Sequence, residues 1–141
     1  MSSESVAGSP SPSKAAFWTG WVLGVVPCLL FVMSGVMKLL RLKEVVEGMA
    51  KSGFPDHLLL GLGIVELTCT ILYLIPQTAV LGAILLTGYM GGAIVTHLRL
   101  GEPFWLHILI GVALWLGLYL RDPRLRALAP FRTFAPQNHL K

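Results

Sequence analysis

The sequence predicts an all-α protein, a transmembrane four-helix bundle, and three observations support this prediction. Of its 141 residues, 55% are hydrophobic and 13% are charged, whereas soluble domains average roughly 25% charged residues. The apolar residues fall into four blocks, each about long enough to cross roughly 30 Å of bilayer hydrocarbon as a helix. Because lipid offers no partner for an open backbone, blocks of this length are expected to be helices.

The first part of the chain predicts a tail, a span and a surface helix. Residues 1–16 are rich in Ser, Pro and Gly, a composition typical of a disordered tail. The first span covers about residues 17–40, with Trp18 and Trp21 at its start, where aromatic side chains favour the membrane interface. A short amphipathic helix on the membrane surface follows, ended by the Gly53-Phe54-Pro55 segment; its apolar positions are Leu42, Val45, Val46 and Met49.

Three further spans complete the membrane domain, which covers residues 17–126. The second span, about 58–75, and the third, about 78–98, are separated only by Pro76-Gln77, so they should pack as an antiparallel hairpin. The fourth covers about 104–120 and ends at Arg121-Asp122-Pro123. Residues 127–141 form a basic C-terminal tail.

The distribution of charged residues predicts the acidic partner of the chain and its orientation in the membrane. The net charge is +4, but the basic residues lie in the connections and the tail rather than among aromatic residues, so we expect lipid headgroups and not nucleic acid as the acidic partner. An even number of spans puts both termini on one side of the membrane. The Lys and Arg residues that follow the fourth span favour the cytoplasm for that side, in the plasma (inner) membrane of a bacterium.

Small residues inside the spans predict close helix contacts. Gly20 with Gly24, and Gly88 with Gly92, each form a GxxxG motif, which is consistent with packing inside the bundle or with a homo-oligomer interface. Cys28 and Cys69 lie in apolar blocks without CxxC spacing. They predict buried free thiols, and the sequence indicates neither a disulfide framework nor a metal site.

Polar residues within the spans are the candidate functional residues, because an ionisable side chain at mid-membrane costs about 2.5 to 3.5 kcal/mol. At about 1.5 Å per residue, Glu66 lies about 12 Å below the side opposite the termini. The other candidate polar positions also fall in that half of the bilayer. This placement predicts a polar pocket open to the side opposite the termini, with candidate residues Ser34, Lys38, Glu66, Tyr89, His97, Arg99 and His107.

Each of these residues also has a purely structural interpretation. Glu66 is either a proton carrier or a partner that holds two helices together. Lys38 either lines the pocket or extends to the headgroups. His97 and His107 are either ligand-binding or interfacial, since no further side chain completes a metal or haem site.

Several motifs resemble the DoxX-like family of small four-helix membrane proteins. They are SGVMK at 34–38, GFP at 53–55, GIVELTCTILYLIPQTAVLGAILLTGYMGGAIVTHLRLG at 63–101 and LWLGLYLRD at 114–122. The resemblance covers about residues 22–126 and places Lys38, Glu66, His97 and Arg99 at motif positions. It implies a membrane subunit of quinone-linked sulfur oxidation or quinol oxidation, or a membrane partner of soluble thiol or oxidative-stress enzymes.

Three functions therefore stay open at this stage. The first is a quinone- or quinol-binding redox subunit that works with a soluble or membrane redox partner. The second is a non-enzymatic anchor or scaffold for a soluble partner, and the third is a carrier of a small solute. Glu66 separates the first two, since only the redox subunit requires its carboxyl chemistry.

Overall fold

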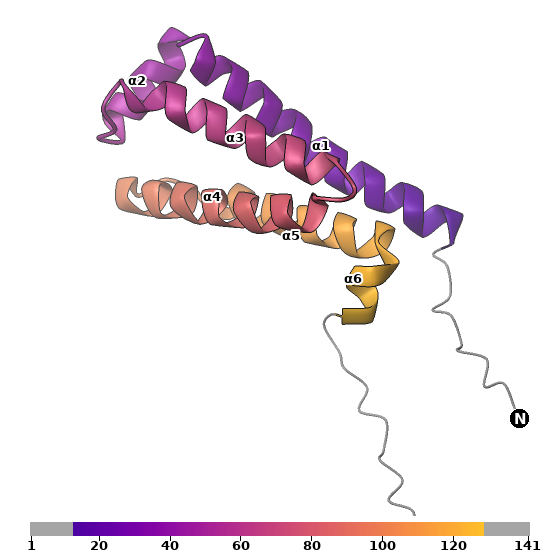
Figure 1. The fold of residues 1–141 in the computed structure, drawn as a ribbon. Coiled ribbons are helices and arrows are strands. Elements are labelled where there is room, and N and C mark those ends of the chain that lie inside the picture. Colours follow the sequence, from indigo (N-terminus) through magenta and orange to yellow (C-terminus); the bar gives the residue numbers. More distant parts are fainter. Residues whose placement is uncertain (1–12, 129–141) are drawn as a thin grey trace, which may run out of the picture.

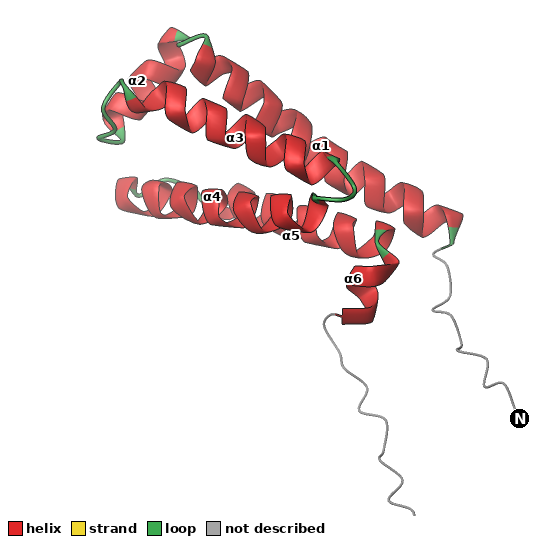
Figure 2. Cartoon of the chain, viewed as in Figure 1, coloured by secondary structure: helices red, strands yellow, loops and turns green. Residues whose placement is uncertain are grey.

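The structure, a computed structural model, describes residues 13–128, and this part of the chain is helical without a strand (Figure 2). The prediction of an all-α protein is therefore confirmed. The helices are α1 (Lys14–Leu39), α2 (Lys43–Lys51), α3 (Leu58–Leu74), α4 (Ala79–Leu100), α5 (Trp105–Arg121) and α6 (Pro123–Leu128).

The four long helices pack side by side in a ring. α1 packs against α3 and α5, and α4 packs against the same two helices. Figure 1 shows α2 at one end of this group, where it connects α1 to α3, and α6 at the opposite end. The tight α3–α4 hairpin expected from Pro76-Gln77 is present, since α3 and α4 pack against each other. A 2.8 Å hydrogen bond that Thr78 Oγ1 donates to the Leu72 carbonyl oxygen stabilises the turn between them.

The ends of the chain differ from the prediction in two places. α1 begins at Lys14, three residues before the predicted start, because the Ser13 side chain accepts a hydrogen bond from Ala16 N and caps the helix. The helix α6 was not predicted. Pro123 provides its first residue, and Asp122 Oδ1 accepts a 2.9 Å hydrogen bond from Arg124 N. Residues 1–12 and 129–141 of the predicted tails lie outside the described residues.

The outer faces of the long helices are apolar. Large side chains such as Leu29 and Leu109 are more than 60% exposed, although a soluble domain rarely leaves broad apolar patches on its surface. By length and composition, α1 and α4 can each cross a membrane, while α3 and α5 are shorter apolar helices. These findings indicate a membrane protein.

The two GxxxG motifs have different surroundings. A Cβ on Gly20 would lie 2.7 Å from the Gly117 carbonyl oxygen, and one on Gly24 would lie 2.9 Å from the Tyr73 hydroxyl group. The first motif therefore packs inside the group of helices, one of the two predicted alternatives. A Cβ on Gly88 or Gly92 would meet no atom within 4 Å, so packing inside the bundle is wrong for the second motif.

Candidate functional site

The predicted polar residues meet in one cavity at the α2 end of the molecule. The cavity has a volume of about 460 Å³, and α1, α3, α4 and α5 each supply lining residues. Met49, Ser52 and Phe54, from α2 and the segment after it, also line it. Of the seven predicted residues, six line this cavity: Ser34, Lys38, Glu66, Tyr89, His97 and His107. Arg99 is exposed and lies outside the lining.

Two glycines place Lys38 beside Glu66. A Cβ on Gly63 of α3 would lie 3.0 Å from the Gly35 carbonyl oxygen of α1, so the two backbones almost touch at this level. Lys38 is one helical turn beyond Gly35, and Glu66 is one turn beyond Gly63. The same face of α3 also carries Thr70 and Tyr73, and both are fully buried.

Three polar groups on α1 and α3 form a connected hydrogen-bond network. Lys38 Nζ donates to Glu66 Oε2 at 2.8 Å and to Ser34 Oγ at 2.5 Å. Ser34 Oγ in turn donates to the same Glu66 oxygen at 3.3 Å. The spacing of Ser34 and Lys38 by one helical turn therefore directs both donors at one carboxyl group.

The charges of this network are almost completely removed from solvent. The Glu66 side chain is 3% exposed and the Lys38 side chain 13%. Burial of a charge costs several kcal/mol per ion, and a partner with good hydrogen-bond geometry offsets that cost. The ion pair thus explains how Glu66 lies inside an apolar helix, and it rules out the interpretation in which Lys38 extends away to the headgroups.

Two histidines lie at the same end, on α4 and α5. The His97 and His107 rings are in contact, with their centroids 4.5 Å apart and their planes tilted by 42°. His97 Nδ1 also lies 3.0 Å from Glu102 Oε2, which forms an ion pair when the imidazole is protonated. Tyr89, from α4, lines the same cavity as Glu66. The cavity therefore holds several groups that donate or accept protons.

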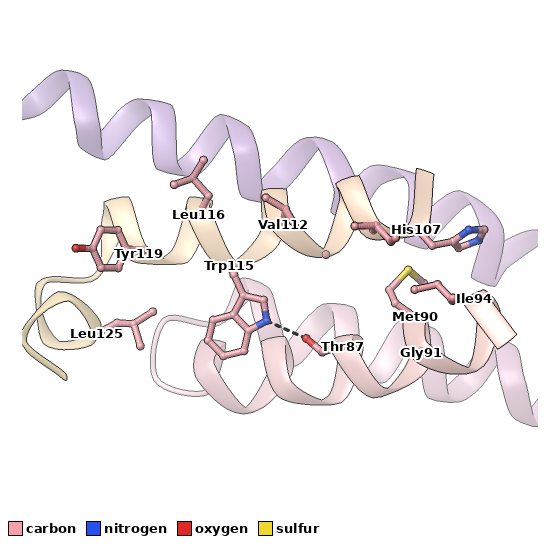
Figure 3. Close-up of a pocket in the computed structure, with 12 residues that line it drawn as sticks. Thr87, Met90, Gly91, Ile94, His107, Val112, Trp115, Leu116, Tyr119 and Leu125 are labelled. Atoms are coloured by element: carbon pink, nitrogen blue, oxygen red, sulfur yellow. Dashed lines mark hydrogen bonds between the residues drawn. The ribbon is translucent and has the colours of Figure 1, made fainter. Parts of the chain in front are cut away.

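An apolar groove adjoins this cavity between α4 and α5 (Figure 3). Its volume is about 810 Å³, and it shares Met90 and His107 with the polar cavity. Near its middle, Trp115 Nε1 donates a 2.9 Å hydrogen bond to Thr87 Oγ1. Gly91 and Gly111 line the groove, and a Cβ on either would meet no atom within 4 Å. The lack of side chains at these two positions leaves the space of the groove unfilled.

Comparison with known proteins identifies the family. A model of the DoxX-like family matches residues 22–121, which is more than two thirds of the chain and contains the whole polar cavity. The chain belongs to the DoxX-like family. Searches among curated proteins and among solved structures found no match. The motifs SGVMK and GIVEL of this DoxX-like protein thus supply Ser34, Lys38 and Glu66, the three members of the network.

Sequence reasoning missed one buried charge in this DoxX-like protein. Arg121, the last residue of α5, is 9% exposed and packs its guanidinium group over the rings of Trp21 and Tyr73. The sequence predicted only that Arg121 ends the fourth span, together with Asp122-Pro123. The signal that could have located it is the helical spacing that places Arg121 one turn after Gly117, on the face that packs against α1.

The other candidate chemistry of this DoxX-like protein is limited to its thiols. Cys28 and Cys69 are both buried and free, as predicted. Among residues 13–128, His, Cys, Asp and Glu form no group of three or more that could hold a metal ion. The polar cavity with its adjoining groove is therefore the best-supported candidate site in the described part of the chain.

Proposed function

We propose that all four long helices cross the membrane and that the protein binds a quinone or quinol as the membrane subunit of a redox system. One observation carries this proposal: a cavity lined by proton-exchanging side chains adjoins an apolar groove, and Met90 and His107 line both. A molecule with a polar ring and an apolar tail matches such a paired site. A metal ion or a small polar solute would use only half of it.

The polar cavity suits the ring of such a ligand. Lys38, Ser34 and Tyr89 carry donors for the ring oxygens, and the Glu66 carboxyl group is an acceptor for a quinol hydroxyl group. The volume of about 460 Å³ falls in the usual range for small-molecule sites, about 300 to 1,000 Å³. Ligand binding would replace part of the Lys38–Glu66–Ser34 network, so these three residues would adjust their hydrogen bonds to the ring.

The groove between α4 and α5 suits the tail. Its lining is dominated by apolar side chains, and Trp115, whose only polar atom is already bonded to Thr87, presents its ring to this space (Figure 3). Because the groove is open along the outside of the helices, a ligand enters laterally from the lipid without crossing water. The polar cavity, in contrast, lies at the end of the spans covered by α2.

The redox step divides between this chain and a partner. Oxidation of a quinol to a quinone releases two protons and two electrons. In the proposal, Glu66 and His97 accept the protons and pass them to the end of the molecule near α2. The electrons go to a redox partner protein that carries its own acceptor group. The chain itself supplies binding and proton transfer, the role that chains of ionisable residues have in membrane proteins.

Native mass spectrometry of the full chain in lipid nanodiscs, loaded with ubiquinone or menaquinone, tests this function. We expect a bound quinone in wild type and about tenfold weaker binding for Glu66→Gln, the effect of losing one charged hydrogen-bond partner. Tyr89→Phe, which keeps the ion pair intact, should weaken binding by a smaller factor. Glu47→Gln, an exposed charge on α2, is the matched control and should bind as wild type does.

Extraction from the native membrane separates the alternatives. Quinone that co-purifies with wild type and is lost from Glu66→Gln supports the redox subunit. A stable partner protein that remains with both variants, with no quinone bound to either, overturns the proposal in favour of a scaffold. Binding of a water-soluble solute that quinones do not displace would overturn it in favour of a carrier.

A further inference from the structure

A second polar cavity lies at the opposite end of the long helices. Its volume is about 420 Å³, and it is lined by Phe17 and Trp21 of α1, Gln77 of the α3–α4 hairpin, and Arg121, Asp122 and Arg124 at the end of α5 and start of α6. Trp21 and Lys38 are 17 residues apart on α1, so this cavity lies about 26 Å along the helix from the Glu66 network. The two cavities share no lining residue.

The central group of this cavity is a buried cation that has no carboxylate partner among the described residues. Arg121 Nη2 donates a 3.0 Å hydrogen bond to the Tyr73 carbonyl oxygen, and the guanidinium carbon lies 4.4 Å from the Trp21 ring centroid and 4.7 Å from that of Tyr73. These contacts hold the side chain in place and favour its charge. None of them neutralises that charge.

One end of the guanidinium group is also without a hydrogen-bond partner. Arg121 Nη1 is inaccessible to solvent and meets no acceptor among residues 13–128. A buried donor left unpaired is costly and uncommon in folded proteins. The neighbouring carboxylate does not serve, because Asp122 Oδ1 accepts its hydrogen bond from Arg124 N and forms no ion pair with Arg121.

We propose that this cavity binds a phosphate group, with Arg121 and Arg124 as the cations that neutralise it and the Gln77 amide as a further donor. A planar guanidinium group held by two rings is suited to bidentate contact with phosphate oxygens. Two arginines against one aspartate give the lining an excess of positive charge. An anion with several acceptor oxygens supplies the missing counter-charge, and a small rotation of the guanidinium group would bring Nη1 within reach of one of these oxygens.

The phosphate can belong to a phospholipid headgroup or to a free phosphate ion. The cavity lies at the ends of the long helices, beside Trp21. If these helices span the bilayer as proposed above, lipid phosphate groups lie at the same depth as the cavity. Basic pockets between spans on the cytoplasmic side bind acidic headgroups in this way. Only the lipid headgroup as the source of the phosphate rests on the proposed four membrane spans. A free phosphate ion would bind to the same side chains without them.

Native mass spectrometry of the full chain with phosphatidylglycerol and phosphatidylcholine tests the site. We expect wild type to retain phosphatidylglycerol preferentially and Arg121→Gln to retain it about tenfold less tightly. Because Arg121→Gln also removes contacts within the fold, Arg124→Gln is the second variant; its exposed side chain should contribute about threefold. Arg99→Gln, an exposed arginine at the other end of α4, is the matched control and should bind as wild type does.

Competition with inorganic phosphate assigns the source. Displacement of the lipid by millimolar phosphate identifies the phosphate group itself as the ligand, and lipid retained in excess phosphate identifies the headgroup. Equal retention of both lipids together with no phosphate binding overturns the proposal. The proposal is also overturned if Arg121→Gln and Arg124→Gln both retain phosphatidylglycerol as tightly as Arg99→Gln does. Quinone binding is read from a different mass, so failure of this proposal and failure of the proposed function are distinguishable.

Discussion

At the scale of single residues, the Lys38–Glu66 pair is a buried ion pair that lines the polar cavity. Both groups are nearly inaccessible to solvent, and they share their hydrogen bonds with Ser34. Removal of one member leaves the other as an uncompensated charge in a low dielectric, which is far more costly than removal of both. The pair is therefore a unit for stability, whatever ligand occupies the cavity.

A double-mutant cycle on this pair gives the first prediction. We expect Lys38→Met to lower the free energy of unfolding by about 3 kcal/mol, because Glu66 is then buried and unpaired. The double variant Lys38→Met with Glu66→Gln should lose markedly less than the sum of the two single changes. Chemical unfolding in detergent micelles measures all four proteins.

The exposed pair Lys43–Glu47 on α2 is the control for this cycle. Its atoms are 3.9 Å apart and both side chains are largely in solvent, so Glu47→Gln should change the free energy of unfolding by less than about 0.5 kcal/mol. Additive losses in the Lys38–Glu66 cycle would show that the two charges act independently and would contradict the structure.

At the scale of helices, the contact between α1 and α5 depends on glycine. A Cβ on Gly117 would lie 2.8 Å from both the Gly20 carbonyl oxygen and the Gly24 nitrogen, and these are backbone atoms that cannot move aside. The same contact brings Trp21 of α1 beside Arg121 of α5. The α1–α5 interface thus also builds the second cavity.

Gly117→Ala gives the second prediction. We expect it to lower the free energy of unfolding by about 2 kcal/mol, because α1 and α5 must separate to admit one methyl group. Gly61→Ala on α3 is the control, since a Cβ there meets no atom within 4 Å and alanine favours a helix over glycine. Thermal unfolding followed by circular dichroism compares the two variants, and equal transition temperatures would contradict close packing at Gly117.

The helices also show which features the sequence can and cannot predict. The polar cavity was predictable because the fixed rise of a helix converts sequence spacing into depth, which placed Glu66, Lys38 and His107 at one end. Arg99 lies on the same helix as Tyr89 and His97 but points to a different face, and depth alone does not distinguish faces. The groove between α4 and α5 depends on how closely two helices pack at Gly91 and Gly111, which small residues permit but do not specify.

At the scale of the whole molecule, the two cavities occupy opposite ends of the same four helices. α2 covers the end with Glu66, and the α3–α4 hairpin and α6 lie at the end with Arg121 (Figure 1). If the helices span a bilayer, one site faces each surface. The apolar groove between α4 and α5 is lined by residues from His107 to Leu125, and so it extends along the helices from the Glu66 end toward the Arg121 end.

Whether the two cavities face opposite membrane surfaces depends on how many of the long helices cross the membrane. The helix lengths show which two helices leave this number open. α1 and α4 have 26 and 22 residues, while α3 and α5 have 17 each, or about 26 Å, the lower limit for crossing the hydrocarbon. Four spans put the α2 region and the α4–α5 connection on one side of the membrane, and the α3–α4 hairpin and α6 on the other. Two spans, α1 and α4, would instead put the α2 region and the hairpin together.

Cysteine labelling in sealed vesicles gives the third prediction. In a chain with alanine at both native cysteines, single cysteines are introduced at Lys51, Gln77, Glu102 and Arg124, all four of them exposed positions. We expect a membrane-impermeant maleimide to label Lys51→Cys and Glu102→Cys from one side, and Gln77→Cys and Arg124→Cys only from the other, because each long helix reverses the side. Labelling of Lys51→Cys and Gln77→Cys from the same side would reduce the protein to two spans. The Glu66 and Arg121 cavities would then no longer face opposite surfaces.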